Sequence, residues 1–203
     1  MGLPVGLVLT SDAEMSSMMR GYLRYHFPMS KPLVLSARLK EAALHYLERY
    51  ESSVQSVRRV LRRRVERWAL KSGAPVEEGA FEMIETVIAD LQRAGLLDDS
   101  RYAGVKARSL FRGGRSGRAI GAYLAQRGVS SEAIGEALEA RAEEVEEGVE
   151  PDLEAALRFA QKKRLGRFRP AHLREEKRER DRAALGRAGF SWAIAKTVVD
   201  EEM

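Results

Sequence analysis

Three groups of residues in this 203-residue chain have types that could do chemistry: three histidines, a pair of aspartates and a glycine-rich segment. The histidines, His26, His45 and His172, share no metal-ligand spacing, and no HExxH motif occurs. The pair Asp98-Asp99 could indicate an acid/base or metal pair. It follows a glycine and precedes an apolar helical pattern, however, which favours helix capping and stabilisation of the helix dipole.

The glycine-rich segment, FRGGRSGR at 111–118, contains the glycines of a phosphate loop. It lacks the GK[ST] ending and a preceding strand, so we expect a turn between helices that contacts a partner. The chain has no cysteine, which excludes disulfides, thiolate zinc sites and cysteine nucleophiles. Without a convincing nucleophile, base or metal set, we predict a protein that is not an enzyme and needs no cofactor or metal.

Basic clusters are more informative, and the first is VRRVLRRRVERW at 57–68. At 100° per residue, Val57, Val60, Leu61, Val65 and Trp68 fall on one apolar arc of a helix. The opposite arc holds Arg58, Arg59, Arg62, Arg63 and Arg67. Arg64 falls inside the apolar arc, so it must extend to solvent or find an acid. Because only Glu66 relieves the positive arc, we favour a binding role, with a solvated helix face as the alternative.

A second basic cluster is QKKRLGRFRP at 161–170. It surrounds Phe168 with Lys162, Lys163, Arg164, Arg167 and Arg169. Basic residues with an interleaved aromatic suit a phosphate backbone, or an acidic protein groove with an apolar notch. The segment 139–154 is strongly acidic, so the positive surface cannot be uniform along the chain.

Composition sets wider limits. The net charge is +5 and the pI about 9.6, which mildly favours an anionic partner. Arginine is far commoner than lysine and asparagine is missing, a bias that a GC-rich genome can also produce. No apolar run approaches the roughly 20 residues of a membrane span, and the N-terminus lacks the basic region and cleavage site of a signal peptide. We therefore expect a cytoplasmic protein that does not enter a membrane.

Helical spacing of apolar residues begins near Ser36, a plausible N-cap, and continues almost to the end of the chain. Strand patterns are scarce. Further helices are predicted at 53–72, 77–94, 100–111, 117–126, 131–146, 151–163, 170–187 and 192–200.

The sequence also resembles itself. EAALHY at 41–46 returns as EAALRF at 154–159, and LAQRGVSSEAI at 124–134 returns approximately as LGRAGFSWAI at 185–194. The repeating unit is three helices, which predicts an all-α, elongated and curved tandem array of three helix-turn-helix-like repeats. We place the repeats at 36–96, 97–148 and 149–203. Residues 1–35 are expected to be a loosely ordered extension, with Met29 as an alternative translation start.

Four segments, in order, resemble the RecX family, bacterial regulators of the recombinase RecA. They are AALHYLERYESSVQSVRRVLRRRV at 42–65, GLLDDSRYA at 95–103, RSGRAIGAYLAQRGV at 115–129, and KKRLGRF…AALGRAGFSWAIAKTVV within 162–199. The match covers about residues 31–200. Its middle block is fairly specific, and the order of the four segments along one chain is strong.

The resemblance implies tandem three-helix repeats that bind along the groove of RecA filaments on single-stranded DNA. Inhibited strand exchange and ATP hydrolysis would follow, as part of recombination and DNA repair. It brings no catalytic residue, so the expected contacts are the basic residues of this chain's own clusters. Besides the residues of the two clusters above, they include Arg112, Arg115 and Arg118. We expect a monomer, with double-stranded DNA as a weaker partner.

Two alternatives stay open. Three-helix units with glycine turns also suit a helix-turn-helix transcription regulator that binds DNA. Against it, the helix after the turn in the second repeat carries glutamates where base-reading side chains would lie. The other alternative is a helical scaffold that does not bind nucleic acid.

Overall fold

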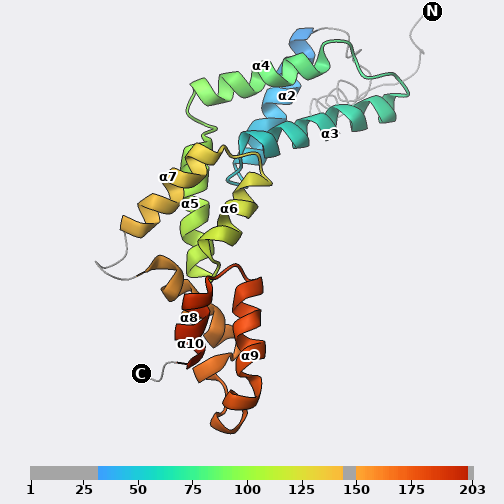
Figure 1. Ribbon diagram of the computed structural model, residues 1–203. Coiled ribbons are helices and arrows are strands. Elements are labelled where there is room, and N and C mark those ends of the chain that lie inside the picture. The colour runs from blue at the N-terminus through green and yellow to red at the C-terminus, as the bar shows by residue number, and fades with distance from the viewer. Residues whose placement is uncertain (1–31, 144–149, 201–203) are drawn as a thin grey trace, which may run out of the picture.

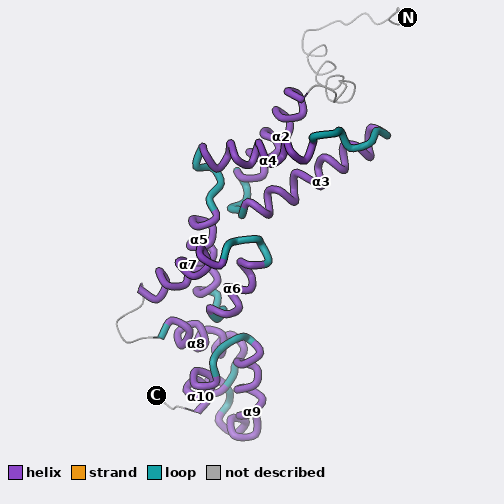
Figure 2. Tube along the Cα trace, turned by 45° about the horizontal axis from the view of Figure 1, so that its top comes forward, coloured by secondary structure: helices purple, strands orange, loops and turns teal. Residues whose placement is uncertain are grey.

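The computed structural model describes residues 32–143 and 150–200, and within these residues it is helical, without a strand. Helices α2 (Pro32–Leu47), α3 (Val54–Ser72) and α4 (Ala80–Arg93) form the first unit. The second contains α5 (Asp99–Arg112), α6 (Gly117–Ala125) and α7 (Ser131–Glu143). The third contains α8 (Pro151–Lys163), the short 3-10 helix η1 (Gly166–Phe168), α9 (Ala171–Arg187) and α10 (Trp192–Asp200). The units follow one another along an elongated body, which confirms the all-α tandem array (Figures 1 and 2).

The predicted helices agree with the observed ones except at some ends. Ser36 does not cap the first helix, because α2 begins at Pro32 and Ser36 lies inside it. Proline has a fixed φ that suits a helix start, and the sequence pattern did not use this signal. α4 begins at Ala80 rather than at 77, after a left-handed Gly79. Residues 1–31, with the Met29 start, and the predicted end of the helix at 146 lie outside the described residues.

The first unit has its own hydrophobic core. Leu39, Leu61 and Ile84, one from each helix, are completely buried. On α3, Val57, Leu61 and Val65 are buried as predicted, whereas Val60 and Trp68 are only half-buried. Neighbouring helices therefore cover a narrower stripe of α3 than the apolar arc of the sequence.

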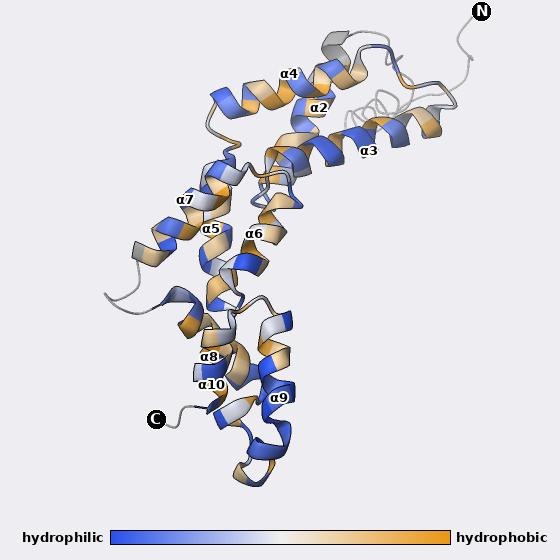
Figure 3. Ribbon diagram, in the orientation of Figure 1, coloured by the Kyte–Doolittle hydropathy of each residue, from blue (hydrophilic) through white to orange (hydrophobic). Residues whose placement is uncertain are grey.

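The second and third units share one continuous core, which includes Phe111, Leu124, Leu185 and Val198. The predicted repeat boundary at 148/149 lies outside the described residues, and the proposed repeat limits stay a prediction. Helix α9 is the most polar part of this region (Figure 3). Its Arg178–Glu175 and Arg182–Glu179 ion pairs form a salt-bridged face.

A buried joint links the first unit to the second. Ser53, the N-cap of α3, accepts a hydrogen bond from the Ser56 amide and donates its own hydroxyl to the Arg127 carbonyl at 2.7 Å. The Val54 amide donates to Oδ1 of Asp99, the first residue of α5, at 2.9 Å. The start of α3 is therefore fixed on both the end of α6 and the start of α5.

The same joint recurs between the second and third units. Ser116, the N-cap of α6, donates to the Ala188 carbonyl at 2.8 Å, and the Gly117 amide donates to Oδ1 of Asp152 at 2.8 Å. Ser53 and Ser116 are both completely buried. Helices α9, α6 and α3 consequently follow one another end to end along one side of the body (Figure 1).

Close packing at each joint requires a glycine. A Cβ on Gly128 would lie 2.6 Å from Cβ of Gln55, and a Cβ on Gly189 would lie 2.6 Å from Oγ of Ser116. Both glycines also have left-handed backbones, with φ of 75° and 94°. These are the glycines of the self-similar segments in the sequence. Their recurrence therefore reflects contacts between units as well as helix ends.

Within the described part of the chain, no helix is both long and apolar enough to span a membrane.

Candidate partner-binding surface

The first predicted cluster divides into residues with different contacts. Arg58 forms two hydrogen bonds with Glu85 of α4, both 2.7 Å long. These hydrogen bonds raise the pKa of Arg58 and lower the pKa of Glu85. Arg58 therefore joins α3 to α4. Glu85, in addition to Glu66, offsets part of the positive charge on this side of α3.

Arg59 and Arg62 are exposed on the same helix. Arg59 lies 3.4 Å from the Ser56 hydroxyl, and the Arg62 guanidinium lies 4.7 Å from the ring centre of Phe81. The Phe81 contact holds Arg62 against α4 and leaves its charge at the surface.

Arg63, Arg64 and Arg67 line a pocket of about 280 Å³ between α2 and α3. Arg63 and Arg67 are exposed and Arg64 is half-buried. None of the three has an ion-pair partner within 4 Å among the described residues, so Arg64 reaches the pocket without pairing with an acid. Tyr46 and Tyr50 lie on the other wall.

In the second unit, Arg112, Arg115 and Arg118 are all exposed around the predicted turn. The segment 113–116 does connect α5 to α6. Among the described residues, only Arg115 of the three has a ring contact, with its guanidinium 5.7 Å from the centre of the Tyr123 ring.

Two further cations, which the sequence pattern did not indicate, lie near the ring of Tyr123. The Arg127 guanidinium stacks 3.5 Å from its ring centre, and Lys106 Nζ lies 5.9 Å away. The phenol of Tyr123 is hydrogen-bonded to Tyr102, and burial, helped by Tyr123, raises the pKa of Tyr102 to about 12. The Tyr102 phenol therefore stays neutral at physiological pH.

The basic residues of the third unit's cluster also differ in their exposure and contacts. Lys162, Lys163 and Arg164 are exposed where α8 ends. The Arg167 guanidinium lies 5.4 Å from the ring centre of Phe168, and both side chains are half-buried.

Arg169 is a structural residue. It forms hydrogen bonds of 2.9 and 2.7 Å with Asp181, whose side chain is only 1% exposed and also accepts from the Gly166 amide. Burial alone would raise the pKa of Asp181, but these hydrogen bonds hold its pKa below the usual value. Arg169 therefore neutralises a buried acid, and its Nε and Nη2 groups are used within the chain.

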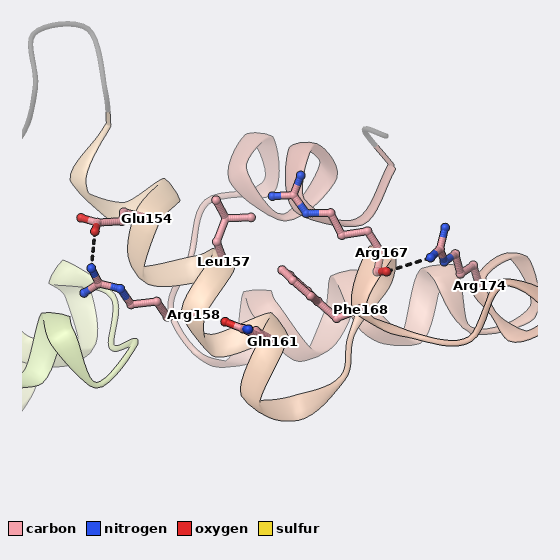
Figure 4. Close-up of a pocket in the computed structure, with 7 residues that line it drawn as sticks. All are labelled: Glu154, Leu157, Arg158, Gln161, Arg167, Phe168 and Arg174. Carbon is pink, nitrogen blue, oxygen red and sulfur yellow. Dashed lines mark hydrogen bonds and ion pairs between the residues drawn. The ribbon is translucent and has the colours of Figure 1, made fainter. Parts of the chain in front are cut away.

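The larger pocket, of about 690 Å³, lies beside this cluster between α8 and the start of α9 (Figure 4). Leu157, Gln161 and Phe168 lie in its middle. Arg158 pairs with Glu154, and Arg174 donates to the carbonyls of Arg167 and Arg169. Three of its polar side chains are thus occupied by contacts within the chain.

The two aspartates that could form an acid/base or metal pair also have structural roles. Asp98 caps α5 through the Arg101 amide, as predicted, whereas Asp99 caps α3 across the joint. Sequence spacing gave no signal of this second role. Among the described residues, no group of three or more His, Asp or Glu side chains could hold a metal ion.

Comparison with known proteins identifies the family of this chain. A family model described as the second three-helix domain of RecX matches residues 98–138. Regulatory protein RecX of Myxococcus xanthus (strain DK1622) is 45% identical over 163 residues, which cover 80% of this chain and 84% of the relative. This chain belongs to the RecX family.

A second relative, regulatory protein RecX of Agrobacterium fabrum (strain C58 / ATCC 33970), is 33% identical over 103 residues, about half of each chain. The crystal structure of RecX from Lactobacillus salivarius has a TM-score of 0.61 at 20% identity, covering 82% of this chain and 96% of that one. Another RecX crystal structure has a TM-score of 0.57 at 19% identity, covering 96% of this chain and 80% of that one. These structures confirm the RecX fold. The relatives are named as regulatory proteins and not as enzymes.

Proposed function

We propose that this RecX-family protein regulates RecA by binding RecA filaments on single-stranded DNA, and that its main effect is inhibition. The observation that supports the proposal most is the combination of a long body with exposed cations on all three units. Arg63 and Arg67, Arg112 and Arg118, and Lys162 and Lys163 have no ion-pair partner among the described residues.

A body of this kind suits a repetitive partner. Three units held by buried joints present their basic residues at fixed separations, and many weak contacts on one rigid body add together as avidity. Contacts with neighbouring filament subunits would favour one inter-subunit geometry. They would oppose the changes that ATP turnover requires, because a ligand shifts a conformational equilibrium toward the state that it binds better.

The DNA-binding transcription regulator is the rival. Its reading helix would be α7, whose exposed residues include Glu132, Glu136 and Glu139. These carboxylates would repel a phosphate backbone, so α7 is poorly suited to the major groove.

Co-sedimentation with purified RecA tests the proposal. Filaments assembled on single-stranded DNA with a slowly hydrolysed ATP analogue should carry the protein into the pellet, whereas RecA without DNA should not. Footprinting on double-stranded DNA supplies the comparison. Protection of one defined duplex sequence, without binding to filaments, would favour the transcription regulator instead.

A further inference from the structure

The pocket between α2 and α3 has an unusual lining. Four arginines, Arg49, Arg63, Arg64 and Arg67, surround it together with two tyrosines, and no acidic residue of the described ranges lines it. Glu48 is a nearby acid, and its carboxylate lies 3.6 Å from Nδ1 of His45, another lining residue. A concave site with several cations and no acid in its lining is suited to an anion.

These arginines are not occupied by the fold. Arg49, Arg63, Arg64 and Arg67 form no ion pair with an acid of the described residues. In the larger pocket of the third unit, by contrast, Arg158 and Arg174 are held by Glu154 and by backbone carbonyls. Arg167 is the one arginine of the larger pocket without an acid or carbonyl partner among the described residues, whereas all four arginines of the smaller pocket lack an acid partner there.

The tyrosines offer flat apolar surface in the same place. The rings of Tyr46 and Tyr50 are 5.1 Å apart between centres and inclined at 41°. Tyr50 is 55% exposed, which is uncommon for so large a side chain in a folded domain. An exposed ring beside cations is the arrangement that stacks a nucleobase while a phosphate is held alongside.

Half-buried Arg127 of the second unit lies at the first joint, where its guanidinium stacks on Tyr123 and donates to the Tyr123 carbonyl. The Tyr46 phenol is close enough to Tyr102 to contribute to its raised pKa, and Tyr102 is hydrogen-bonded to Tyr123, on which Arg127 stacks. The Arg127 backbone carbonyl in turn accepts from Ser53, at the foot of α3. Arg64 and Arg127 also lie the same number of residues after the capping serines of their helices.

We propose that Tyr46, Tyr50, Arg63, Arg64, Arg67 and Arg127 form a tyrosine–arginine track that binds single-stranded DNA across the first joint. Bases stack on Tyr50 and Tyr46, and phosphates contact the guanidinium groups on both sides of the joint. The inference deepens the proposed function, on which it rests, by naming the surface that takes the DNA.

An acidic peptide is the competing ligand, and the lining disfavours it. The aliphatic side chains of the pocket are those of Ala42 and Val60, which are too small to bury a large apolar residue of a peptide. Tyrosine rings and guanidinium planes instead match a ligand that alternates flat bases with phosphates, and stacking of this kind needs no particular base sequence.

Fluorescence anisotropy with a labelled oligo(dT) strand, without RecA, tests the track. Tyr50→Ala is expected to weaken binding by roughly five-fold or more, because each stacked base contributes about 1–3 kcal/mol. Tyr50→Phe keeps the ring and should bind like the unchanged protein. Trp192→Ala on α10 is the matched control: Trp192 is 68% exposed and has Lys196 5.5 Å from its ring centre, but it lies outside the track. It should not change affinity.

The charges are tested in the same way. Arg67→Ala should weaken binding several-fold, and Arg187→Ala, which removes another exposed arginine at the end of α9, should have a much smaller effect. Replacing Arg63, Arg64 and Arg67 together by alanine should reduce the slope of log Kd against log salt by roughly 2, because each phosphate contact on a single strand contributes about 0.7. Circular dichroism checks that each variant is folded.

A photo-crosslinking experiment locates the DNA directly. An oligonucleotide with 5-iododeoxyuridine should crosslink to peptides that contain Tyr50 or Tyr46. Crosslinks confined to other segments, or unchanged affinity in Tyr50→Ala and the triple arginine variant, would overturn the track. A poly-glutamate peptide that competes with oligo(dT) and does not depend on Tyr50 would show an acidic-peptide site instead. Each of these results is separate from the co-sedimentation test, since filaments could bind the protein through its other basic residues.

Discussion

The hydroxyl of Ser53 donates a hydrogen bond to the backbone carbonyl of Arg127 at 2.7 Å, although 74 residues separate the two in the sequence. The same serine oxygen caps α3, so one buried side chain both starts a helix and attaches it to the next unit. Ser116 and Ala188 repeat this relationship between the second and third units. The joints therefore fix how the basic residues of successive units are spaced.

Loss of a joint serine should cost more than loss of an ordinary helix cap. Ser53→Ala and Ser116→Ala each remove a cap and leave a part-buried carbonyl without its partner, so we expect about 2 kcal/mol less stability in urea unfolding. Ser130→Ala is the matched control, because exposed Ser130 caps α7 through the Ala133 amide and, within the described ranges, forms no side-chain hydrogen bond with another unit. Its cost should be about 1 kcal/mol. Equal costs at all three positions would contradict the role of the joint.

The joint aspartates should make stability depend on pH. Burial raises the pKa of Asp152, while the hydrogen bond from the Gly117 amide opposes the shift. A carboxyl group with a raised pKa in the folded state favours folding when protonated, and this contribution is lost as pH rises through the folded pKa. Asp152→Asn keeps the acceptor oxygen without the charge, so its stability relative to the unchanged protein should be higher at pH 7 than at pH 4. Urea unfolding at the two pH values measures the difference, and a change of the opposite sign would show that the amide bond outweighs burial.

The two arginines beside Phe168 should have different effects. Arg169→Ala removes the partner of buried Asp181 and should cost about 3 kcal/mol in thermal or urea unfolding. Arg167→Ala removes a half-buried cation that has no acid partner among the described residues, and it should cost less than about 1 kcal/mol. If the Arg167 variant were the less stable of the two, the assignment of Arg169 as the structural residue would be wrong.

Stabilisation of Asp181 also has a definite pH range. Its pKa is lowered in the folded state, so its contribution is present above the ordinary carboxyl pKa and is lost as pH falls below it. Arg169→Ala should therefore lose less stability, relative to the unchanged protein, as the solution becomes more acidic than about pH 4. An acid titration followed by circular dichroism would show this, whereas a cost independent of pH would contradict the ion pair.

Alanine variants of Arg58 and Arg67 should separate an effect on folding stability from an effect on DNA binding. Arg58→Ala breaks a two-fold hydrogen-bonded but partly exposed pair with Glu85 and should cost about 1 kcal/mol with little change in DNA affinity. Arg67→Ala should weaken DNA binding with little loss of stability. Arg67 is exposed and lines the pocket without an ion pair to a described residue. Unfolding and anisotropy on the same two variants measure both quantities. A binding defect confined to Arg58→Ala would place the contact on the outer face of α3.

The sequence predicted most helices and the three-helix repeat, because these depend on local apolar spacing and on glycines that end helices. The limits of α8 and α10 were predicted to the residue. Local pattern did not predict what side chains contact across units. Asp99 looked like a cap for its own helix, and the self-similar segments gave no signal that their glycines lie between units.

Local sequence pattern also predicted only part of the candidate surface. A helical projection separated the arginines of α3 from its apolar side, but it could not show that Arg58 meets Glu85 on another helix. It also treated Arg64 as an exception, whereas this residue lines a basic pocket. The tyrosines of the track lie at the end of α2 and just after it, its three central arginines lie on α3, and Arg127 follows α6, so no single segment of sequence carries the signal of the track.

The rate of ATP hydrolysis by RecA filaments tests most directly our proposal that the protein regulates RecA on single-stranded DNA. The purified full-length protein is titrated into RecA with saturating single-stranded DNA and ATP, beside the variant with Arg63, Arg64 and Arg67 replaced by alanine. We predict that the unchanged protein lowers the hydrolysis rate in a dose-dependent way and that the folded variant needs a several-fold higher concentration. A hydrolysis rate that does not change, at protein concentrations equal to or above that of RecA, would contradict the account.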